Sequence, residues 1–236
     1  MKYFIITFLA LSVLLIAGCK TSTKNPSDQQ VQKKQFEVTQ DSIDQLVKAT
    51  EEKFRAMNTE QLISELEQSA LKGREPFNSA SFREIIKRKD AAEPLYKSIT
   101  DSTQKEYFKL MALQKIDKEL YTKIKPANGA AILTDALAKS EVFNAWGLPN
   151  EYWESSARAI IDYQTAAVKY LERLLDDKRD APVWGSEEAA IYQQYKFRVC
   201  DYALALLYTM KQKRDLLPVS PRERDTLIEA YKKDKK

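Results

Sequence analysis

The sequence predicts an all-α fold, and three observations favour it. The chain has 236 residues, of which only five are glycine, whereas Ala, Leu, Lys, Glu and Gln are plentiful. These abundant residues are good helix formers, and their excess is typical of helices joined by short loops. From Asp41 onward the apolar residues recur at helical spacing, as Ile43, Leu46 and Val47 do. Clusters of Pro, Gly and Asn interrupt these periodic stretches, as loops between helices do.

The periodic stretches give the expected helices in order. The first begins near Asp41, where Asp41 or Ser42 can cap it. Pro94 belongs to the first turn of a short helix, because an interior proline would break the hydrogen-bond ladder. The other helices are expected from Thr59 to Gly73, from Phe82 onward, and over Ala91–Ile99, Lys105–Ile124, Ala130–Phe143, Glu151–Asp176 (one or two helices), Glu187–Met210 and Arg222–Tyr231. Loops are expected over Arg74–Ser81, Pro126–Gly129, Ala145–Asn150 and Asp177–Ser186.

The first nineteen residues have the pattern of an export signal. Met1 and Lys2 are followed by the apolar run Tyr3–Ala17, and the run closes on Gly18 and Cys19. A positive start, a short apolar segment and small residues at its end are typical of a secretory signal peptide. The sequence Ile-Ala-Gly-Cys at residues 16–19 resembles the lipobox of bacterial lipoproteins. The resemblance implies cleavage between Gly18 and Cys19, diacylglyceration of the Cys19 thiol and acylation of the new amino terminus.

This resemblance sets the expected domain organisation. Residues 1–18 are a lipoprotein signal peptide, residues 19–35 a lipidated tether, and residues 36–236 a single all-helical domain. The stretch Lys20–Gln35 is polar and contains one proline, so we expect a flexible coil that spans about 20–25 Å. Lys20 follows the cysteine, where the enterobacterial family uses aspartate to retain lipoproteins in the inner membrane. By that resemblance the protein is anchored in the outer membrane and faces the periplasm.

Composition argues against several kinds of function. Histidine is absent, which removes the commonest metal ligand and the commonest general base, and no metal or other cofactor is expected. The net charge of +4 arises from interleaved Lys, Arg, Asp and Glu, which argues against a nucleic-acid surface. Once Cys19 carries lipid, Cys200 is the remaining thiol, and we expect it to be a small buried apolar side chain. Any catalysis would depend on carboxylates, hydroxyls, Lys or Tyr.

Two parts of the chain can be aligned as a weak internal repeat. Residues 91–101 match residues 166–176, and each stretch ends in aspartate and is followed by a second helix, at 111–116 and 202–207. A helix ending in Asp, a loop and a helix with a small residue at its middle resembles the unit of HEAT-like repeats. The resemblance implies an irregular α-solenoid or helical array. An unrelated all-helical bundle remains an equal alternative, because the loops of the two copies differ.

One dipeptide raises the question of an enzyme. Glu154-Ser155 resembles the Glu-Ser pair of lytic transglycosylases, in which a glutamate protonates the glycosidic oxygen. The Gly-Leu-Met-Gln sequence that should follow in that family is missing here. We therefore favour the interpretation that Glu154 lies at a helix N-terminus, where the helix dipole favours acids.

Aromatic residues are the candidate partner-binding groups. If clustered and exposed they could bind a sugar or a protein, although core packing is the more frequent role of such residues. The candidates are Trp146, Tyr152, Trp153 and Trp184.

Three functional hypotheses follow. The leading one is a non-enzymatic lipoprotein, attached to the membrane by its N-terminal lipid, whose helical surface binds another cell-envelope protein. The second is an enzyme that acts on peptidoglycan or another glycan with a carboxylate general acid, which requires a cleft holding an acid of raised pKa beside aromatics. The third, a carrier of a small ligand or lipid, requires an apolar cavity.

Overall fold

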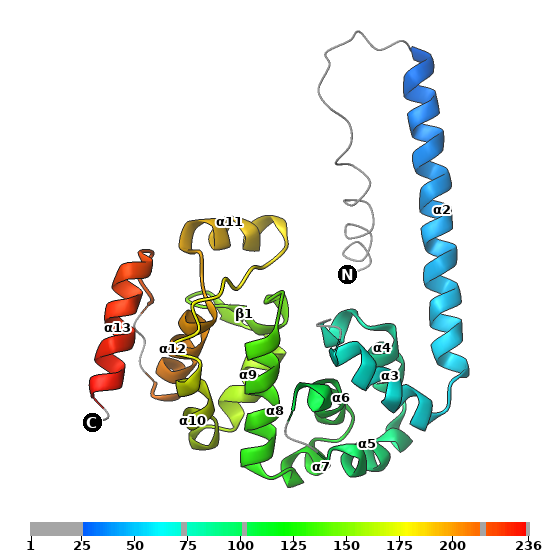
Figure 1. Cartoon of the computed structure of the whole chain (residues 1–236). Helices are drawn as coiled ribbons and strands as arrows, with labels where there is room; N and C mark the ends of the chain where they lie inside the picture. The colour runs from blue at the N-terminus through cyan, green and yellow to red at the C-terminus, as the bar shows by residue number, and fades with distance from the viewer. Residues whose placement is uncertain (1–25, 72–74, 101–102, 213–215, 235–236) are drawn as a thin grey trace. The chain divides into compact units, whose positions relative to one another are not determined.

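The computed structural model describes residues 26–71, 75–100, 103–212 and 216–234, and its backbone is all-α apart from one short hairpin (Figure 1). The chain divides into two units, Met1–Met57 and Asn58–Lys236. The α-helices are α2 (Pro26–Ala56), α3 (Thr59–Leu71), α4 (Ala80–Ile85), α5 (Ala92–Ser98), α6 (Tyr107–Ile116), α7 (Lys118–Lys123), α8 (Pro126–Lys139), α9 (Ser155–Asp162), α10 (Thr165–Arg173), α11 (Ser186–Tyr195), α12 (Val199–Met210) and α13 (Pro221–Lys233). The strands are β1 (Gly147–Leu148) and β2 (Tyr152–Trp153), and one-turn 3₁₀ helices begin at Pro76, Lys89, Gln104 and Asn144.

Helix α2 differs from the expected tether. It is a continuous helix from Pro26 to Ala56, so the residues from 26 to 35 that we expected to be flexible are helical. Lys, Gln and Glu favour both solvated coils and solvated helices, which is why polarity alone did not separate the two. Pro26 suits a first turn because the N–H that it lacks would have no partner within the helix. The signal peptide and Cys19 lie outside the described residues.

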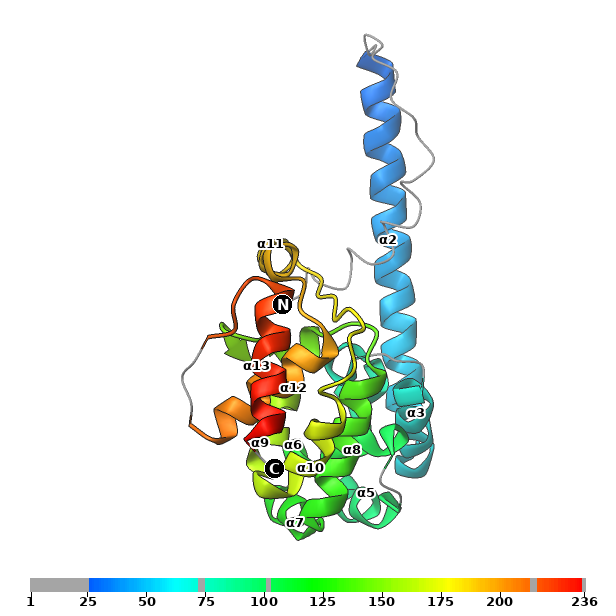
Figure 2. The same ribbon diagram turned by 60° about the vertical axis from the view of Figure 1, so that its left-hand side comes forward.

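The unit of residues 58–236 is organised around two buried helices, α6 and α12. Every residue of α6 from Tyr107 to Leu113 is buried, and so is every residue of α12 from Val199 to Tyr208. Helices α3, α4, α5, α7 and α8 contact α6, whereas α9 and α10 contact α12. Helix α8 also contacts α10, and this links the two groups. Figure 2 shows the compact arrangement of these helices within the unit.

Two helices predicted as continuous are interrupted. The stretch Lys105–Ile124 breaks at Asp117, whose extended backbone and side-chain oxygen cap α7 by accepting the N–H of Leu120 at 2.9 Å. The stretch Glu187–Met210 breaks after α11, where Lys196 is left-handed and the chain turns before α12. In both places the apolar spacing continues across the break, so periodicity hides it.

Two predicted loops contain regular structure. Pro126–Gly129 was expected to interrupt the chain and instead begins α8, with Pro126 in the first turn, where proline is tolerated. Ala145–Asn150 contains β1, and β2 follows where a helix was expected from Glu151. Strands of two residues are too short to show an alternating pattern.

The two helix pairs of the internal repeat are present as packed pairs, α5 with α6 and α10 with α12. They differ in what joins them. The 3₁₀ helix Gln104–Glu106 lies between α5 and α6, whereas α11 lies between α10 and α12. The fold is therefore all-α, and the HEAT-like arrangement remains a prediction. Within the part of the chain that the structure describes, no helix is both long enough and apolar enough to cross a bilayer.

Candidate functional site

The candidate site is built on the β1–β2 hairpin. The strands are antiparallel, with Gly147 opposite Trp153 and Leu148 opposite Tyr152. Gly147 has φ +87°, and a Cβ there would lie 2.4 Å from the carbonyl oxygen of Tyr152. Since no L side chain fits, this glycine is what lets the two strands approach. Asn150, with φ +77°, forms the turn, a conformation that Asn tolerates better than most residues.

Two asparagines attach distant loops to this hairpin. The Asn144 side chain accepts the N–H of Trp184 at 2.8 Å and donates to the carbonyl oxygen of Trp184 at 2.5 Å. The Asn150 side chain likewise accepts the N–H of Leu217 at 2.8 Å and donates to its carbonyl oxygen at 2.9 Å. In each case one amide group satisfies both backbone groups of one residue, as a neighbouring strand would. The loops before α11 and before α13 are thereby held to the hairpin.

These three segments carry four of the five large apolar side chains that are exposed in the described part of the unit. Tyr152 is 38% exposed, Trp184 47%, Leu216 69% and Val219 44%. Among the residues that the structure describes in the 58–236 unit, Leu71 is the one other large apolar side chain in this class. We call Tyr152, Trp184, Leu216 and Val219 the hairpin surface. Such a grouping is typical of interaction sites, because single exposed apolar residues are common and groups of them are not.

A buried arginine holds the loop that carries Leu216 and Val219. Arg224 is fully buried, and its guanidinium lies 3.0 Å from Asp201. The same guanidinium donates to the carbonyl oxygen of Val219 at 2.6 Å and to that of Pro218 at 2.9 Å. Charge-assisted hydrogen bonds of this kind fix backbone position. The loop is therefore held in place from both sides, by Arg224 and by Asn150.

Helix α12 holds the hairpin through hydrogen bonds and ring contacts. The Tyr202 hydroxyl donates to the carbonyl oxygen of Gly147 at 2.8 Å, and the indole N–H of Trp153 donates to the hydroxyl of Thr209 at 3.1 Å. The Tyr202 ring also contacts the rings of Trp153 and Phe143. Burial raises the pKa of Tyr202 well above its ordinary value, so its hydroxyl remains a neutral donor.

The four predicted aromatic residues do not form one exposed cluster. Tyr152 and Trp184 are exposed and belong to the hairpin surface, whereas Trp153 is half-buried. Trp146 is buried, stacks on Tyr107 with ring centres 5.5 Å apart, and donates to the Ser140 hydroxyl at 2.8 Å. A partner cannot reach a side chain in that position, so the prediction that Trp146 binds a partner is wrong.

Asn144, Asn150, Leu216 and Val219 were not among the residues predicted from the sequence. The two asparagines resemble ordinary loop residues, since their partners lie 40 and 67 positions away along the chain. Leu216 and Val219 flank Leu217-Pro218, and two large apolar residues in so short a loop are a usable signal.

Carboxylates surround the hairpin. Glu154 is exposed and lies at the N-cap of α9, which agrees with the helix-terminus interpretation. Glu75 is half-buried, and its carboxylate accepts the N–H of Ala145 at 2.7 Å and the Asn78 amide at 2.8 Å. Burial raises the pKa of Glu75, the hydrogen bond from Ala145 partly opposes the shift, and the charge of Glu154 adds to it. Glu188 folds over Gly185, where a Cβ would lie 2.3 Å from its Oε2.

Other candidate chemistry receives little support from the described residues. Cys200 is fully buried, and burial together with the Asp201 charge raises the pKa of its thiol to about 12. Because the thiolate is the reactive form, this cysteine is inert at neutral pH. No group of three or more Cys, Asp or Glu in the described ranges could hold a metal ion.

Comparison with known proteins gives no relative. No protein-family model, no curated protein and no solved structure matches the chain. Function must therefore be argued from the hairpin surface and its neighbours.

Proposed function

We propose that this protein is a lipid-anchored envelope lipoprotein that binds another envelope protein through the hairpin surface. One observation carries the proposal: the exposed apolar residues lie on three segments that asparagine side chains and Arg224 hold together. A surface whose backbone is already ordered loses little conformational entropy on binding. The location rests on the lipobox resemblance at residues 16–19, with attachment through Cys19 and exposure to the periplasm from the outer membrane.

The binding test compares two surface substitutions with a matched control. Tyr152→Ser with Trp184→Ser removes the aromatic part of the hairpin surface, and Leu71→Ser removes an apolar side chain that is 58% exposed elsewhere in the unit. Purified full-length protein is mixed with envelope extract, and the retained proteins are quantified by mass spectrometry. We expect at least one protein retained by wild type and Leu71→Ser to be lost from the double variant. Equal retention by all three would contradict the proposal.

The anchoring test uses Cys19→Ala. Without the thiol no diacylglycerol can be attached, so the variant is expected in the soluble rather than the membrane fraction. Radiolabelled palmitate should enter the wild type and not the variant. An unchanged membrane fraction would show that the protein is held by something other than lipid.

A second candidate, a glycan-acting enzyme, is supported by Glu75. Its raised pKa and its interaction with Glu154 are properties of a carboxyl that donates a proton. Against this role, both oxygens of Glu75 already accept protein hydrogen bonds. The test is release of soluble fragments from purified peptidoglycan by wild type and by Glu75→Gln. No release by the wild type would remove the enzyme hypothesis for this substrate.

A further inference from the structure

Two of the three segments that form the hairpin surface carry acidic side chains, namely the hairpin and the segment that leads into α11. Glu151 lies in the hairpin turn, and Glu154 follows β2, with its N–H donating to the carbonyl oxygen of Trp146 at 3.2 Å. Glu187 and Glu188 lie in the first turn of α11, one residue after Trp184 and Gly185. Because Glu188 folds over Gly185, its carboxylate lies against the residue that follows the exposed Trp184. Carboxylates therefore border the part of the hairpin surface that carries Tyr152 and Trp184.

Within the described ranges no ion pair with Lys or Arg involves Glu151, Glu154, Glu187 or Glu188. Some exposed acids elsewhere are paired along their helices, as in Glu52–Lys48, Glu93–Lys97 and Glu119–Lys123, whereas others, such as Glu60, Asp90 and Glu141, form no ion pair with a described Lys or Arg. What sets the four carboxylates apart is therefore their position beside the exposed rings of Tyr152 and Trp184. The basic side chain that reaches the hairpin is Arg158, which donates to the carbonyl oxygen of Trp153 at 2.7 Å. A chain with net charge +4 thus leaves a negative region around its exposed aromatic rings.

Local electrostatics agree with this placement. Burial raises the pKa of Tyr152, and the charges of Glu188 and then Glu154 raise it further. Both carboxylates are therefore close enough to the Tyr152 hydroxyl to act on it. Negative potential beside aromatic faces is the environment that attracts an ammonium or guanidinium group, through charge and through cation–π attraction together.

We propose that the hairpin surface binds a lysine- or arginine-bearing segment of the partner protein, with the cation held between the rings of Tyr152 and Trp184 and the carboxylates of Glu154 and Glu188. This inference rests on the proposed function. It excludes anionic partners such as nucleic acid or acidic lipid, which the carboxylates repel. The apolar stems of Lys and Arg suit the remaining part of the surface, Leu216 and Val219, because these side chains bury their methylenes while the charge stays near water.

The direct test uses short peptides as probes. Full-length protein in a non-ionic detergent is titrated with hexalysine and hexaarginine, with hexaglutamate as the control, and the tryptophan fluorescence is followed. Trp184 is the exposed one of the three tryptophans, so a ligand on the hairpin surface should protect it from acrylamide quenching. We expect saturable protection by both basic peptides and none by hexaglutamate. Binding should weaken at least tenfold between 50 and 300 mM salt, since ion-pair contacts are screened.

Matched variants assign the effect to the carboxylates. Glu154→Gln with Glu188→Gln removes two charges without changing side-chain size, and Glu93→Gln with Glu119→Gln removes two exposed charges from α5 and α7. The first pair should weaken hexalysine binding at least tenfold and the second less than twofold. Circular dichroism and thermal unfolding confirm that both variants fold. No binding by the wild type, or equal loss in both variants, would overturn the proposal.

The two proposals can fail separately. If Tyr152→Ser with Trp184→Ser abolishes capture of the envelope protein, whereas Glu154→Gln with Glu188→Gln does not, the surface is an interaction site for a partner that is not recognised by its cations. Protection of Trp184 by neutral chito-oligosaccharides that is insensitive to salt would likewise replace a cationic partner with a glycan. If neither double variant affects capture, both proposals fail.

Discussion

Helices α6 and α12 both begin with an ion pair between the N-cap residue and the third helical residue, but the acid and the base exchange places. At the start of α6, Glu106 is the N-cap and Lys109 the third helical residue, with the lysine nitrogen 2.6 Å from Glu106 Oε2. At the start of α12, Arg198 is the N-cap and Asp201 the third helical residue, with the guanidinium 3.0 Å from Asp201 Oδ1. All four side chains are buried. One helix has acid then base, and the other has base then acid.

The order of the charges determines how many further partners the third helical residue needs, because the helix dipole favours an acid there and disfavours a base. Asp201 lies where the helix dipole favours an acid, and it also accepts the N–H of Arg198 at 2.9 Å. Lys109 lies where the dipole disfavours a cation, and it is stabilised by a second acid, Glu67, at 2.6 Å and by the carbonyl oxygen of Ser98 at 2.7 Å. The α6 cluster therefore has two acids around one buried base, with Lys105 at its edge, 4.0 Å from Glu106.

The α12 cluster combines two arginines with two acids, and it leads to the hairpin surface. Asp201 contacts both Arg198 and Arg224, and Arg198 also reaches Asp225 at 2.9 Å. Arg224 in turn holds the loop that carries Leu216 and Val219. The α6 cluster joins α3 and α5 to α6. A buried charge cluster can therefore stabilise the core or hold a surface loop in place, depending on which groups its remaining hydrogen-bond donors reach.

The largest expected effect is that of Lys109→Met. The α6 cluster has one central base, so this change leaves Glu106 fully buried, with Lys105 4.0 Å away as its remaining cation. Breaking a buried pair in this way costs about 3–5 kcal/mol. Urea unfolding measures it, with Lys97→Met as the control, since Lys97 is an exposed lysine paired along its own helix. A loss below 1 kcal/mol would mean that Glu106 is neutral or reaches solvent.

Arg224→Met should cost less, about 2–3 kcal/mol, the worth of hydrogen bonds to a charged group. Asp201 keeps Arg198 as a partner, so no buried acid is left alone. The change also releases the carbonyl oxygens of Pro218 and Val219, so the hairpin surface should loosen. Hydrogen exchange of residues 216–220 should accelerate more than that of α6. A loss larger than that of Lys109→Met would reverse the proposed ranking of the two clusters.

The acid-rich cluster also predicts an effect of pH. Burial raises the pKa of Glu106, Lys109 opposes the shift, and Glu67 adds to it. A carboxyl whose pKa is higher in the folded than in the unfolded protein binds its proton more readily when folded. Stability should therefore increase as the pH falls from above the folded pKa towards 4.5, by about 1.4 kcal/mol per unit of pKa difference.

The measurement compares wild type with Glu106→Gln in urea at pH 7 and pH 5. Gln cannot titrate, so the wild type should gain stability relative to the variant at pH 5. A difference that is independent of pH would show that the environment of Glu106 does not shift its pKa. Any change common to both proteins comes from other titrating groups.

The sequence predicted the all-α class and most helix positions, because the core helices repeat apolar residues such as Leu62 and Leu66 at helical spacing. It could not show the breaks at Asp117 and Lys196, where that spacing continues across the interruption. It identified Tyr152 and Trp184 as candidates by residue type. It could not separate them from Trp146, because burial depends on Tyr107, which lies 39 positions earlier in the sequence. The asparagine contacts of the site are long-range pairings that no local pattern encodes.

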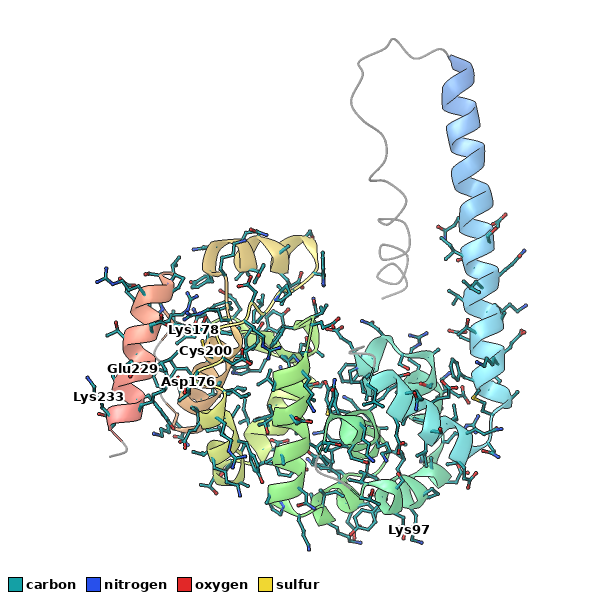
Figure 3. The ribbon with its side chains drawn as sticks, viewed as in Figure 1. Lys97, Asp176, Lys178, Cys200, Glu229 and Lys233 are labelled. Atoms are coloured by element: carbon teal, nitrogen blue, oxygen red, sulfur yellow. The ribbon has the colours of Figure 1, made fainter. Side chains whose placement is uncertain are left out.

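The smallest expected effect is that of Lys178→Met at the edge of the α12 cluster. Figure 3 shows Lys178 close to Cys200 and far from Lys97, which belongs to the other half of the unit. Lys178 contacts Asp225 at 3.0 Å and is mostly exposed, and exposed ion pairs contribute about 0–1 kcal/mol. Burial tends to raise the pKa of Asp225, but the hydrogen bonds from Arg198 and Lys178 outweigh it and lower that pKa.

Because a lowered folded pKa stabilises the protein above the unfolded value, the contribution of Asp225 is present at neutral pH and is lost as the pH falls below 3.8. Asp225→Asn should therefore cost stability at pH 7 and progressively less below pH 3.8, the opposite of the pH dependence expected for Glu106. Lys178→Met should remove a small part of the Asp225 effect, because Arg198 remains. If Lys178→Met lowers the free energy of unfolding as much as Arg224→Met does, the α12 cluster depends on its exposed ion pair. The proposed difference between the α6 and α12 clusters would then be wrong. If the cost is small, the buried arginines alone connect α12 to the surface that we propose binds the partner.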